Sequence, residues 1–262
     1  MASLHYIASG EGAPALVFVH GFGCSHTDWQ AQVAYFSPRF AAVAVDLPGH
    51  GATPAPGDDN SIERCAADLA ALLRALAVPP AVLAGHSLGC RVVLEAAQLA
   101  PQHVAGIVLV DGSQFAPAAA QAFQDRFAAG EYKPLVRGLF EQMFTSRSDS
   151  ATVAAAVERA LMLSEDVGQA LLLSLVRYDV ERLVSVLQRT TKPLLVLQTT
   201  FVNEMRQRAT LRPGQTTPYL DLIRATVPAA RIEVLCDVGH FPQLDAPADT
   251  NHVLERFLAG LA

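Results

Sequence analysis

The sequence has few cysteines, and none of them is paired in a metal-binding spacing. It contains four, scattered through 262 residues without a Cys-x-x-Cys motif: Cys24, Cys65, Cys90 and Cys236. Such spacing is typical of free, buried thiols and indicates neither a zinc site nor a disulfide framework. The glycine motifs of nucleotide-binding loops, G-x-G-x-x-G and G-x-x-x-x-G-K-[ST], are missing too. We therefore expect no metal and no cofactor.

Positive charge and long apolar runs are scarce as well. The chain has 19 Lys and Arg against 25 Asp and Glu, a formal net charge of −6, and no basic run. This balance argues against a nucleic-acid partner, because such binding depends on clustered positive charge. No apolar stretch reaches the ~18 residues of a membrane-spanning helix, and residues 1–6 lack the basic and apolar regions of a signal peptide. We expect a cytoplasmic protein without a membrane partner, and the sequence leaves its oligomeric state open.

Apolar residues make up 51% of the chain, and many fall in short runs separated by helical patterns. Each run is too short and too apolar for a half-exposed strand, so each is typical of a strand buried on both faces of a parallel sheet. The runs are Ala15–His20, Ala41–Asp46, Ala81–His86, Ala105–Asp111, Pro193–Thr199 and Arg231–Asp237. Their alternation with helices predicts an α/β fold with a doubly wound, mostly parallel sheet.

The alternation stops after the run that ends at Asp111. Residues 113–189 contain no convincing strand, while apolar side chains recur at helical spacing, as between Val153 and Leu161. We predict that 113–189 form a helical cap inserted into a core of residues 1–112 and 190–262. Because the insertion lies between two strands of the sheet, we expect it over the carboxyl ends of the strands, where such folds bind ligands.

The run Ala81–His86 leads into Gly85-His86-Ser87-Leu88-Gly89, and a helical pattern follows. A G-x-S-x-G sequence between a strand and a helix is typical of a nucleophile elbow. The sharp turn lifts the serine hydroxyl clear of its neighbours and points the helix N-terminus toward developing negative charge. The alternative is an ordinary glycine turn whose serine caps the helix. Ser87 is therefore the candidate nucleophile.

Three further segments make the pattern specific. They are His20-Gly21-Phe22-Gly23 after the first run, Asp46-Leu47-Pro48-Gly49-His50-Gly51 after the second, and Gly239-His240-Phe241-Pro242 after the last. Together with the elbow, and in this order over nearly the whole chain apart from the cap, they resemble the α/β-hydrolase superfamily. The resemblance implies an α/β-hydrolase fold in which Ser87 is the nucleophile and His240 its general base.

The same resemblance implies the groups that surround the nucleophile. The backbone N–H groups of Phe22 and Leu88 would form the oxyanion hole, which binds the charged oxygen of a tetrahedral intermediate. The side chains expected to support loops rather than react are His20, His50, His86 and Asp46. The three arginines of the segment before the last helices are expected on a solvated surface loop. They are Arg206, Arg208 and Arg212.

The acid that orients the base is the point where the sequence departs from the family. Most of these hydrolases carry an Asp shortly after the strand that matches Pro193–Thr199, but residues 200–205 contain none. Two carboxylates remain, Asp111 at the end of a strand and Glu204 in the loop. We favour Asp111, because a strand end holds a carboxylate more rigidly than a loop does and some family members carry the acid there. A third candidate is Asn203, since an amide orients the base in papain-like enzymes.

These features predict a serine hydrolase, and more specifically a carboxylesterase that cleaves small apolar esters through an acyl-enzyme on Ser87. Apolar cap residues, among them Phe115, Phe140 and Phe144, favour an uncharged acyl or aromatic substrate. The same catalytic residues would serve a carbon–carbon bond hydrolase, and the position of the acid is shared with cofactor-free dioxygenases. The alternative outside enzymes is a degenerate hydrolase that binds a small molecule, for which the missing Asp is the only support.

Overall fold

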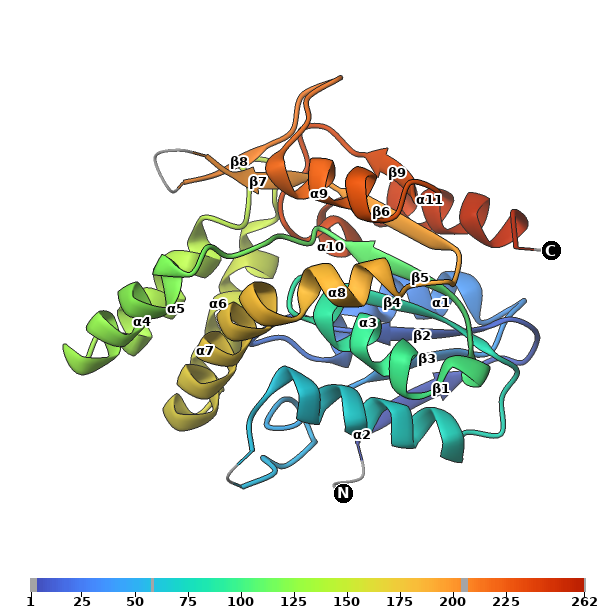
Figure 1. Ribbon diagram of the computed structural model, residues 1–262, viewed down its shortest axis with the longest axis horizontal. Coiled ribbons are helices and arrows are strands. Elements are labelled where there is room, and N and C mark those ends of the chain that lie inside the picture. Colours follow the sequence, from blue (N-terminus) through green and yellow to red (C-terminus); the bar gives the residue numbers. More distant parts are fainter. Residues whose placement is uncertain (1–3, 58, 204–206, 262) are drawn as a thin grey trace.

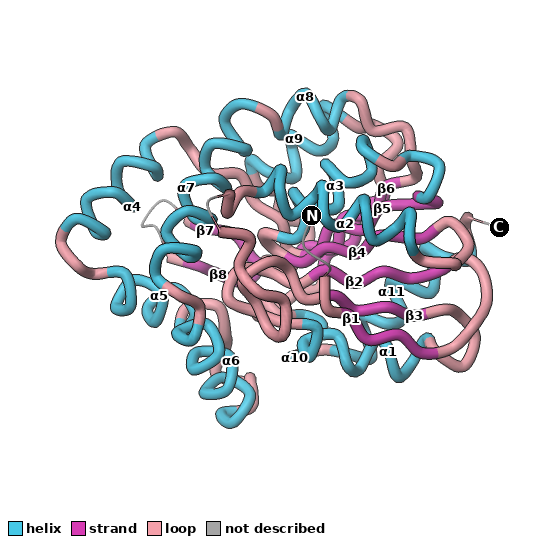
Figure 2. Tube along the Cα trace, turned by 90° about the horizontal axis from the view of Figure 1, so that it is seen from below, coloured by secondary structure: helices cyan, strands magenta, loops and turns pink. Residues whose placement is uncertain are grey.

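The computed structural model describes residues 4–57, 59–203 and 207–261, which form a seven-stranded sheet with helices on both faces (Figures 1 and 2). The strands lie in the order β1-β3-β2-β4-β5-β6-β9. Their bounds are β1 Tyr6–Ser9, β2 Ala15–Val19, β3 Ala42–Val45, β4 Ala81–His86, β5 Val104–Val110, β6 Leu194–Gln198 and β9 Arg231–Val234. β1 runs antiparallel to β3, and the other neighbouring pairs of this sheet are parallel. The predicted doubly wound, mostly parallel sheet is confirmed.

The central strands are buried on both faces, which explains their continuous apolar runs. In β2, Val17 packs into the cluster that includes α2 and α3, while Phe18 packs into the cluster that includes α1 and α11 on the opposite face. Phe18 stacks on the fully buried Trp29 with ring centroids 4.9 Å apart. Full burial of an apolar side chain of this size stabilises the fold by roughly 1.5–3 kcal/mol. The helices around the sheet are α1 Gln30–Phe36, α2 Ile62–Ala75, α3 Gly89–Leu99, α9 Pro218–Thr226, α10 Pro242–Asp245 and α11 Pro247–Ala259.

Each of the six predicted runs contains a strand, but three short strands were not predicted. One is β1, at the edge of the sheet, whose side chains are mostly exposed and so lack an apolar run. The other two form an antiparallel hairpin, β7 Thr200–Val202 and β8 Arg208–Thr210, directly after β6. Three residues are too few to produce a recognisable alternation of apolar and polar side chains. The hairpin matters because it brings Arg208 back toward the sheet.

The segment between β5 and β6 is helical throughout its regular structure, and its described residues contain no strand. Its helices are α4 Ala118–Ala128, α5 Tyr132–Glu141, α6 Ser150–Met162, α7 Glu165–Glu181 and α8 Leu183–Gln188. Figure 1 shows α4 to α7 gathered beyond one end of the sheet, whereas α8 runs back alongside α3. The Ser174 hydroxyl on α7 accepts a hydrogen bond from the backbone N–H of Ile62 at 3.0 Å. We propose that residues 113–189 form a cap over the carboxyl ends of the strands.

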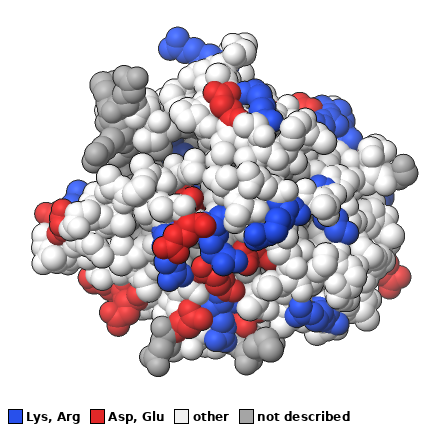
Figure 3. All heavy atoms as spheres, viewed as in Figure 1, with Lys and Arg blue, Asp and Glu red and all other residues white. Residues whose placement is uncertain are grey.

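Charged side chains on the surface are mixed in sign. On the face drawn in Figure 3, acidic and basic groups lie side by side and form no large patch of one charge. Arg177 on α7 pairs with Glu63 on α2 at 3.0 Å. Arg182, the residue that follows α7, pairs with Glu95 on α3 at 2.5 Å. Within the described residues, no helix combines the length and the apolar character needed to span a membrane.

Candidate active site

Ser87 lies in a tight turn between β4 and α3, and its backbone occupies the left-handed region with a φ of 52°. This conformation is strained for a residue with a side chain and is typical of a nucleophile elbow. The turn is crowded, since a Cβ on Gly85 would lie 2.3 Å from the carbonyl oxygen of Gly89. A Cβ on Gly89 would lie 2.7 Å from the carbonyl oxygen of His20. Only glycine fits at these two places, and the turn leaves Ser87 partly exposed.

The two predicted oxyanion donors lie beside this turn. A Cβ on Gly21 would be 3.1 Å from the Cβ of Ser87, so the loop that carries Phe22 runs directly against the serine. Leu88 follows Ser87 immediately, at the start of α3. No hydrogen bond from the backbone N–H of Phe22 or Leu88 is found among the described residues. Two such N–H groups next to a serine are available to a developing oxyanion.

His20 and His50 hold the oxyanion loop through hydrogen bonds. The backbone N–H of Leu47 donates to His20 Nε2 at 2.9 Å, and that of Gly23 donates to His50 Nε2 at 3.1 Å. Burial lowers the pKa of His20 to about 3 and that of His50 to about 4. Both rings are therefore neutral at physiological pH, as their acceptor role requires, and the contacts agree with supporting roles.

Asp111 follows β5 and is fully buried. Its Oδ1 accepts hydrogen bonds from the backbone N–H groups of Thr199 at 2.8 Å and Thr200 at 2.7 Å. Its Oδ2 accepts a hydrogen bond from the Thr200 hydroxyl and lies 2.5 Å from His240 Nδ1. Burial by itself raises the pKa of this carboxyl, but the interactions with His240, Arg208 and the Thr200 hydroxyl together lower the pKa below its usual value. Asp111 is therefore ionised at neutral pH.

His240 lies between β9 and α10 and is 2% exposed. Its backbone N–H donates to the carbonyl oxygen of Met143 at 2.7 Å, and its own carbonyl oxygen accepts from His86 Nε2 at 2.8 Å. The rings of His86 and His240 are 4.7 Å apart, which places His240 beside the residue that precedes Ser87. While Nδ1 faces Asp111, Nε2 has no hydrogen-bond partner in the described part of the chain. An imidazole held this way is arranged to act as a general base.

Arg208 on β8 is a charged neighbour that the sequence analysis missed. Its Nη1 lies 3.2 Å from His240 Nδ1 and 3.6 Å from Asp111 Oδ2, and it donates to the Thr200 hydroxyl at 2.7 Å. Burial, followed by the charge of Arg208, lowers the pKa of His240 to about 4. The expectation of a solvated Arg208 is wrong, because the β7–β8 hairpin turns its side chain inward. No feature of the sequence near residue 208 indicates that contact.

The other residues considered for the acid and for the surface loop are Asn203, Glu204, Arg206 and Arg212. Glu204 and Arg206 are outside the described residues. The Asn203 side chain accepts a hydrogen bond from the backbone N–H of Gln207 at 3.0 Å, within the hairpin. Among the described residues, Asp111 rather than Asn203 contacts His240 Nδ1. Arg212 is exposed, as expected for a surface loop.

A buried ion pair joins the elbow to α7. Arg91 on α3 donates to both oxygens of Asp179, at 2.9 and 2.7 Å, and both side chains are essentially unexposed. The Nη1 of Arg91 also donates to the carbonyl oxygen of Ser87 at 3.0 Å, and its Nη2 donates to that of Ser113. The bidentate geometry satisfies the buried guanidinium, so this pair fixes the position of the elbow relative to α7.

The fold and this group of side chains define a family. Residues 16–253 match the model of a family described as the alpha/beta hydrolase family. The chain therefore belongs to the α/β hydrolase family, and the resemblance seen in its motifs is confirmed.

Similar proteins include esterases and related enzymes. The chain is 26% identical, over 98% of its length, to the dihydrolipoyllysine-residue acetyltransferase component of the acetoin cleaving system of Cupriavidus necator, of which it covers 67%. It is 39% identical, over 40% of its length, to the pimeloyl-[acyl-carrier protein] methyl ester esterase of Methylococcus capsulatus, of which it covers 39%. The solved structure of Est816, an N-acyl homoserine lactone degrading enzyme, matches with a TM-score of 0.78 and 25% identity, covering 97% of this chain and 96% of that one. The family and the esterase relative support hydrolase activity.

Proposed function

We propose that the protein is a serine hydrolase, and specifically a carboxylesterase that cleaves small apolar esters. The observation that carries the proposal is the arrangement of His240, which meets Asp111 through Nδ1 at 2.5 Å while Nε2 has no partner among the described residues. It lies beside an elbow that holds Ser87 in a strained backbone conformation. A carboxylate, an imidazole and an accessible serine are the groups that acyl transfer through a covalent intermediate requires.

In the proposed reaction, His240 Nε2 removes the proton of the Ser87 hydroxyl as the oxygen attacks the ester carbonyl carbon. Asp111 remains ionised and stabilises the imidazolium that forms. The N–H groups of Phe22 and Leu88 donate to the oxyanion of the tetrahedral intermediate, and loss of one such donor typically costs ~3 kcal/mol. The imidazolium then protonates the leaving alcohol as the carbon–oxygen bond breaks. Water activated by the same imidazole hydrolyses the acyl-enzyme and restores the serine.

The aromatic residues next to His240 support an uncharged acyl group. Phe241 stacks on Phe144 with ring centroids 4.8 Å apart and lies 6.0 Å from the ring of Phe140. These two partners belong to the segment proposed as the cap, and a Cβ on Gly23 would lie 2.9 Å from another cap side chain, Ala160. Burial of an apolar acyl chain in such surroundings stabilises the bound substrate, whereas an ionised chain would lose its hydration without compensation.

Lactones are the second substrate class that we propose, because of the similarity to Est816 over nearly the whole chain. A lactone is a cyclic ester, so the same serine, base and oxyanion hole would open it through an acyl-enzyme that retains the leaving alcohol. The test compares the rates at which the protein hydrolyses p-nitrophenyl esters of increasing acyl length and N-acyl homoserine lactones. A preference for the lactones would place the physiological substrate in this class while leaving the serine mechanism intact.

The experiment that tests the mechanism compares Ser87→Ala with a matched control. We expect Ser87→Ala to abolish hydrolysis of p-nitrophenyl butyrate and labelling by a fluorophosphonate probe, with an unchanged circular dichroism spectrum. Ser37→Ala, at the C-terminal end of α1, should retain both activities. Undiminished turnover by Ser87→Ala would refute the proposal. A wild-type protein that neither turns over any ester or lactone nor reacts with the probe would favour the binding-protein alternative.

A further inference from the structure

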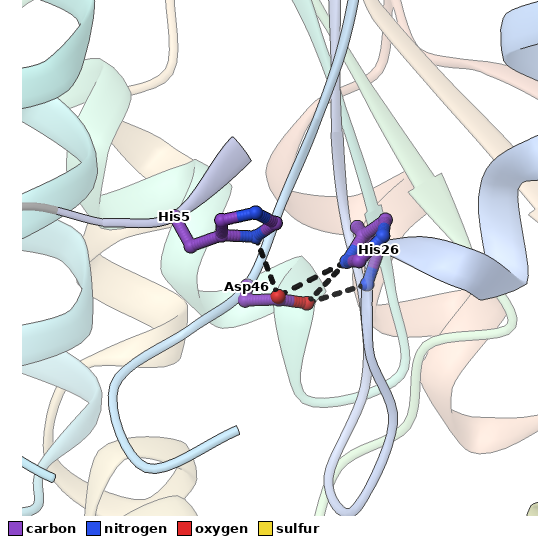
Figure 4. Close-up of side chains that lie close together, drawn as sticks. All are labelled: His5, His26 and Asp46. Carbon is purple, nitrogen blue, oxygen red and sulfur yellow. Dashed lines mark hydrogen bonds and ion pairs between the residues drawn. The ribbon is translucent and has the colours of Figure 1, made fainter. Parts of the chain in front are cut away.

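Two histidines and an aspartate from three separate segments meet at one point on the protein (Figure 4). His5 precedes β1, His26 begins the short helix after the oxyanion loop, and Asp46 follows β3. Figure 4 shows both imidazole rings turned toward the Asp46 carboxylate. None of the three has a role in the proposed reaction, and the cysteine spacing that excluded a zinc motif says nothing about residues so far apart in sequence.

Two of the three distances among the donor atoms are close to those of a tetrahedral zinc site. Asp46 Oδ2 lies 2.9 Å from His5 Nδ1 and 3.0 Å from His26 Nδ1, and one donor atom from each residue lies within 4.8 Å of the other two. Zinc–ligand bonds of about 2.0–2.2 Å at tetrahedral angles place neighbouring ligand atoms about 3.3 Å apart. An ion can bind between the three atoms if the two short edges lengthen by a few tenths of an ångström and the histidine nitrogens, which lie within 4.8 Å of each other, move closer together.

The carboxylate is held in place as a metal ligand needs to be. Asp46 is fully buried, and its oxygens accept hydrogen bonds from the backbone N–H groups of Ala52 at 3.0 Å and His26 at 2.8 Å. Backbone donors of this kind orient ligating carboxylates in known metal sites.

The site is open to solvent on the histidine side. The side chain of His5 is 40% exposed and that of His26 is 20% exposed, whereas that of Asp46 is not exposed at all. An ion can reach the three donors from that side, and water can complete its coordination. Two imidazoles and one carboxylate, without a thiolate, match the preference of zinc and of neighbouring divalent transition metals.

We propose that His5, His26 and Asp46 bind one divalent transition-metal ion of the zinc class through Nδ1, Nδ1 and a carboxylate oxygen. The ion joins the chain before β1, the segment after the oxyanion loop and the end of β3. Two hydrogen bonds already link the oxyanion loop to the segment after β3, from Leu47 N–H to His20 and from Gly23 N–H to His50. The bound metal is therefore a structural brace for the loop that carries Phe22, and the inference stands whether or not the proposed esterase activity is found.

Metal binding by the full chain tests the proposal directly. After treatment with EDTA and dialysis, titration with ZnCl₂ is followed by calorimetry, and bound zinc is counted by elemental analysis. We expect one zinc ion per chain. We also expect an increase of about 5 °C in the unfolding temperature when free zinc is about 100 times its dissociation constant.

The informative variants are His5→Gln and His26→Gln, because a glutamine amide can still donate a hydrogen bond to Asp46 but is a poor zinc ligand. Each should lose zinc binding and the zinc-dependent increase in unfolding temperature while keeping its fold without metal. His252→Ala, an exposed histidine on α11, is the matched control and should bind zinc like the wild type. Absence of stoichiometric zinc from the wild type, or equal binding by the glutamine variants, would overturn the proposal and leave the cluster as a hydrogen-bonded brace.

Discussion

Replacing Arg208 with methionine should shift the pH dependence of the reaction. In the proposed mechanism His240 must be neutral to accept the Ser87 proton, so kcat/KM falls as the pH decreases through the pKa of His240. That pKa is about 4 in the protein, lowered first by burial and then by the charge of Arg208. Methionine occupies a similar volume and carries no charge. The pKa of His240 should therefore rise, and activity should be lost at a higher pH.

The size of the shift follows from the geometry. Arg208 Nη1 lies 3.2 Å from His240 Nδ1, and the side chain is 15% exposed. Two unit charges about 4 Å apart interact by about 4 kcal/mol at an effective dielectric constant of about 20, which corresponds to at most about three pKa units. Water that enters beside the methionine screens part of this interaction. We expect an increase of about one to two pKa units.

The assay measures kcat/KM for p-nitrophenyl butyrate from about pH 3.5 to pH 8, with product followed at its isosbestic wavelength. Arg212→Met is the matched control, because Arg212 is exposed on the loop that follows the same hairpin. Arg208→Lys retains the positive charge and should keep most of the wild-type acid limb. An Arg208→Met profile that coincides with the wild-type profile, in a protein that is folded throughout the range, would refute the role assigned to Arg208.

Two further predictions concern the acid and the buried ion pair. Asp111→Asn should lower kcat by about 10³- to 10⁴-fold with little change in KM, because the imidazole loses the carboxylate that fixes its tautomer and stabilises its charged form. Steady-state kinetics would check this, and a loss of less than tenfold would point to Glu204 as the acid. Arg91→Leu should lower the free energy of unfolding by about 3–5 kcal/mol, because it leaves the Asp179 carboxylate buried without its partner. Urea denaturation measures the loss, and a stability equal to that of the wild type would mean that Asp179 becomes neutral or solvated in the variant.

Local sequence was sufficient for the parts of the fold that local forces control. Five of the six apolar runs marked buried strands, because a strand covered on both faces must be apolar at almost every position. The sixth run contains β9, an edge strand that is only partly buried, so the expectation of burial on both faces is wrong there. The pentapeptide around Ser87 indicated a strained turn, because glycine is required where Gly85 and Gly89 approach other backbone atoms. Asp111 was preferred over Glu204 because of its place at a strand end, and the structure brings its carboxylate into contact with His240. The catalytic roles of these residues remain predictions.

Tertiary structure alone decided which distant side chains share an environment. Arg208 looked like one of three loop arginines, but a hairpin of two short strands directs it to the Asp111 carboxylate. His5, His26 and Asp46 meet because β1 pairs with β3 and the segment after β2 passes the end of β3. Residues within one strand or turn influence each other through the backbone, so the sequence by itself determined the strands in the apolar runs and the elbow, but not the short strands β1, β7 and β8. Charges and ligands brought together by strand order interact only after the chain has folded, so the electrostatics of the site and the histidine cluster were decided by packing.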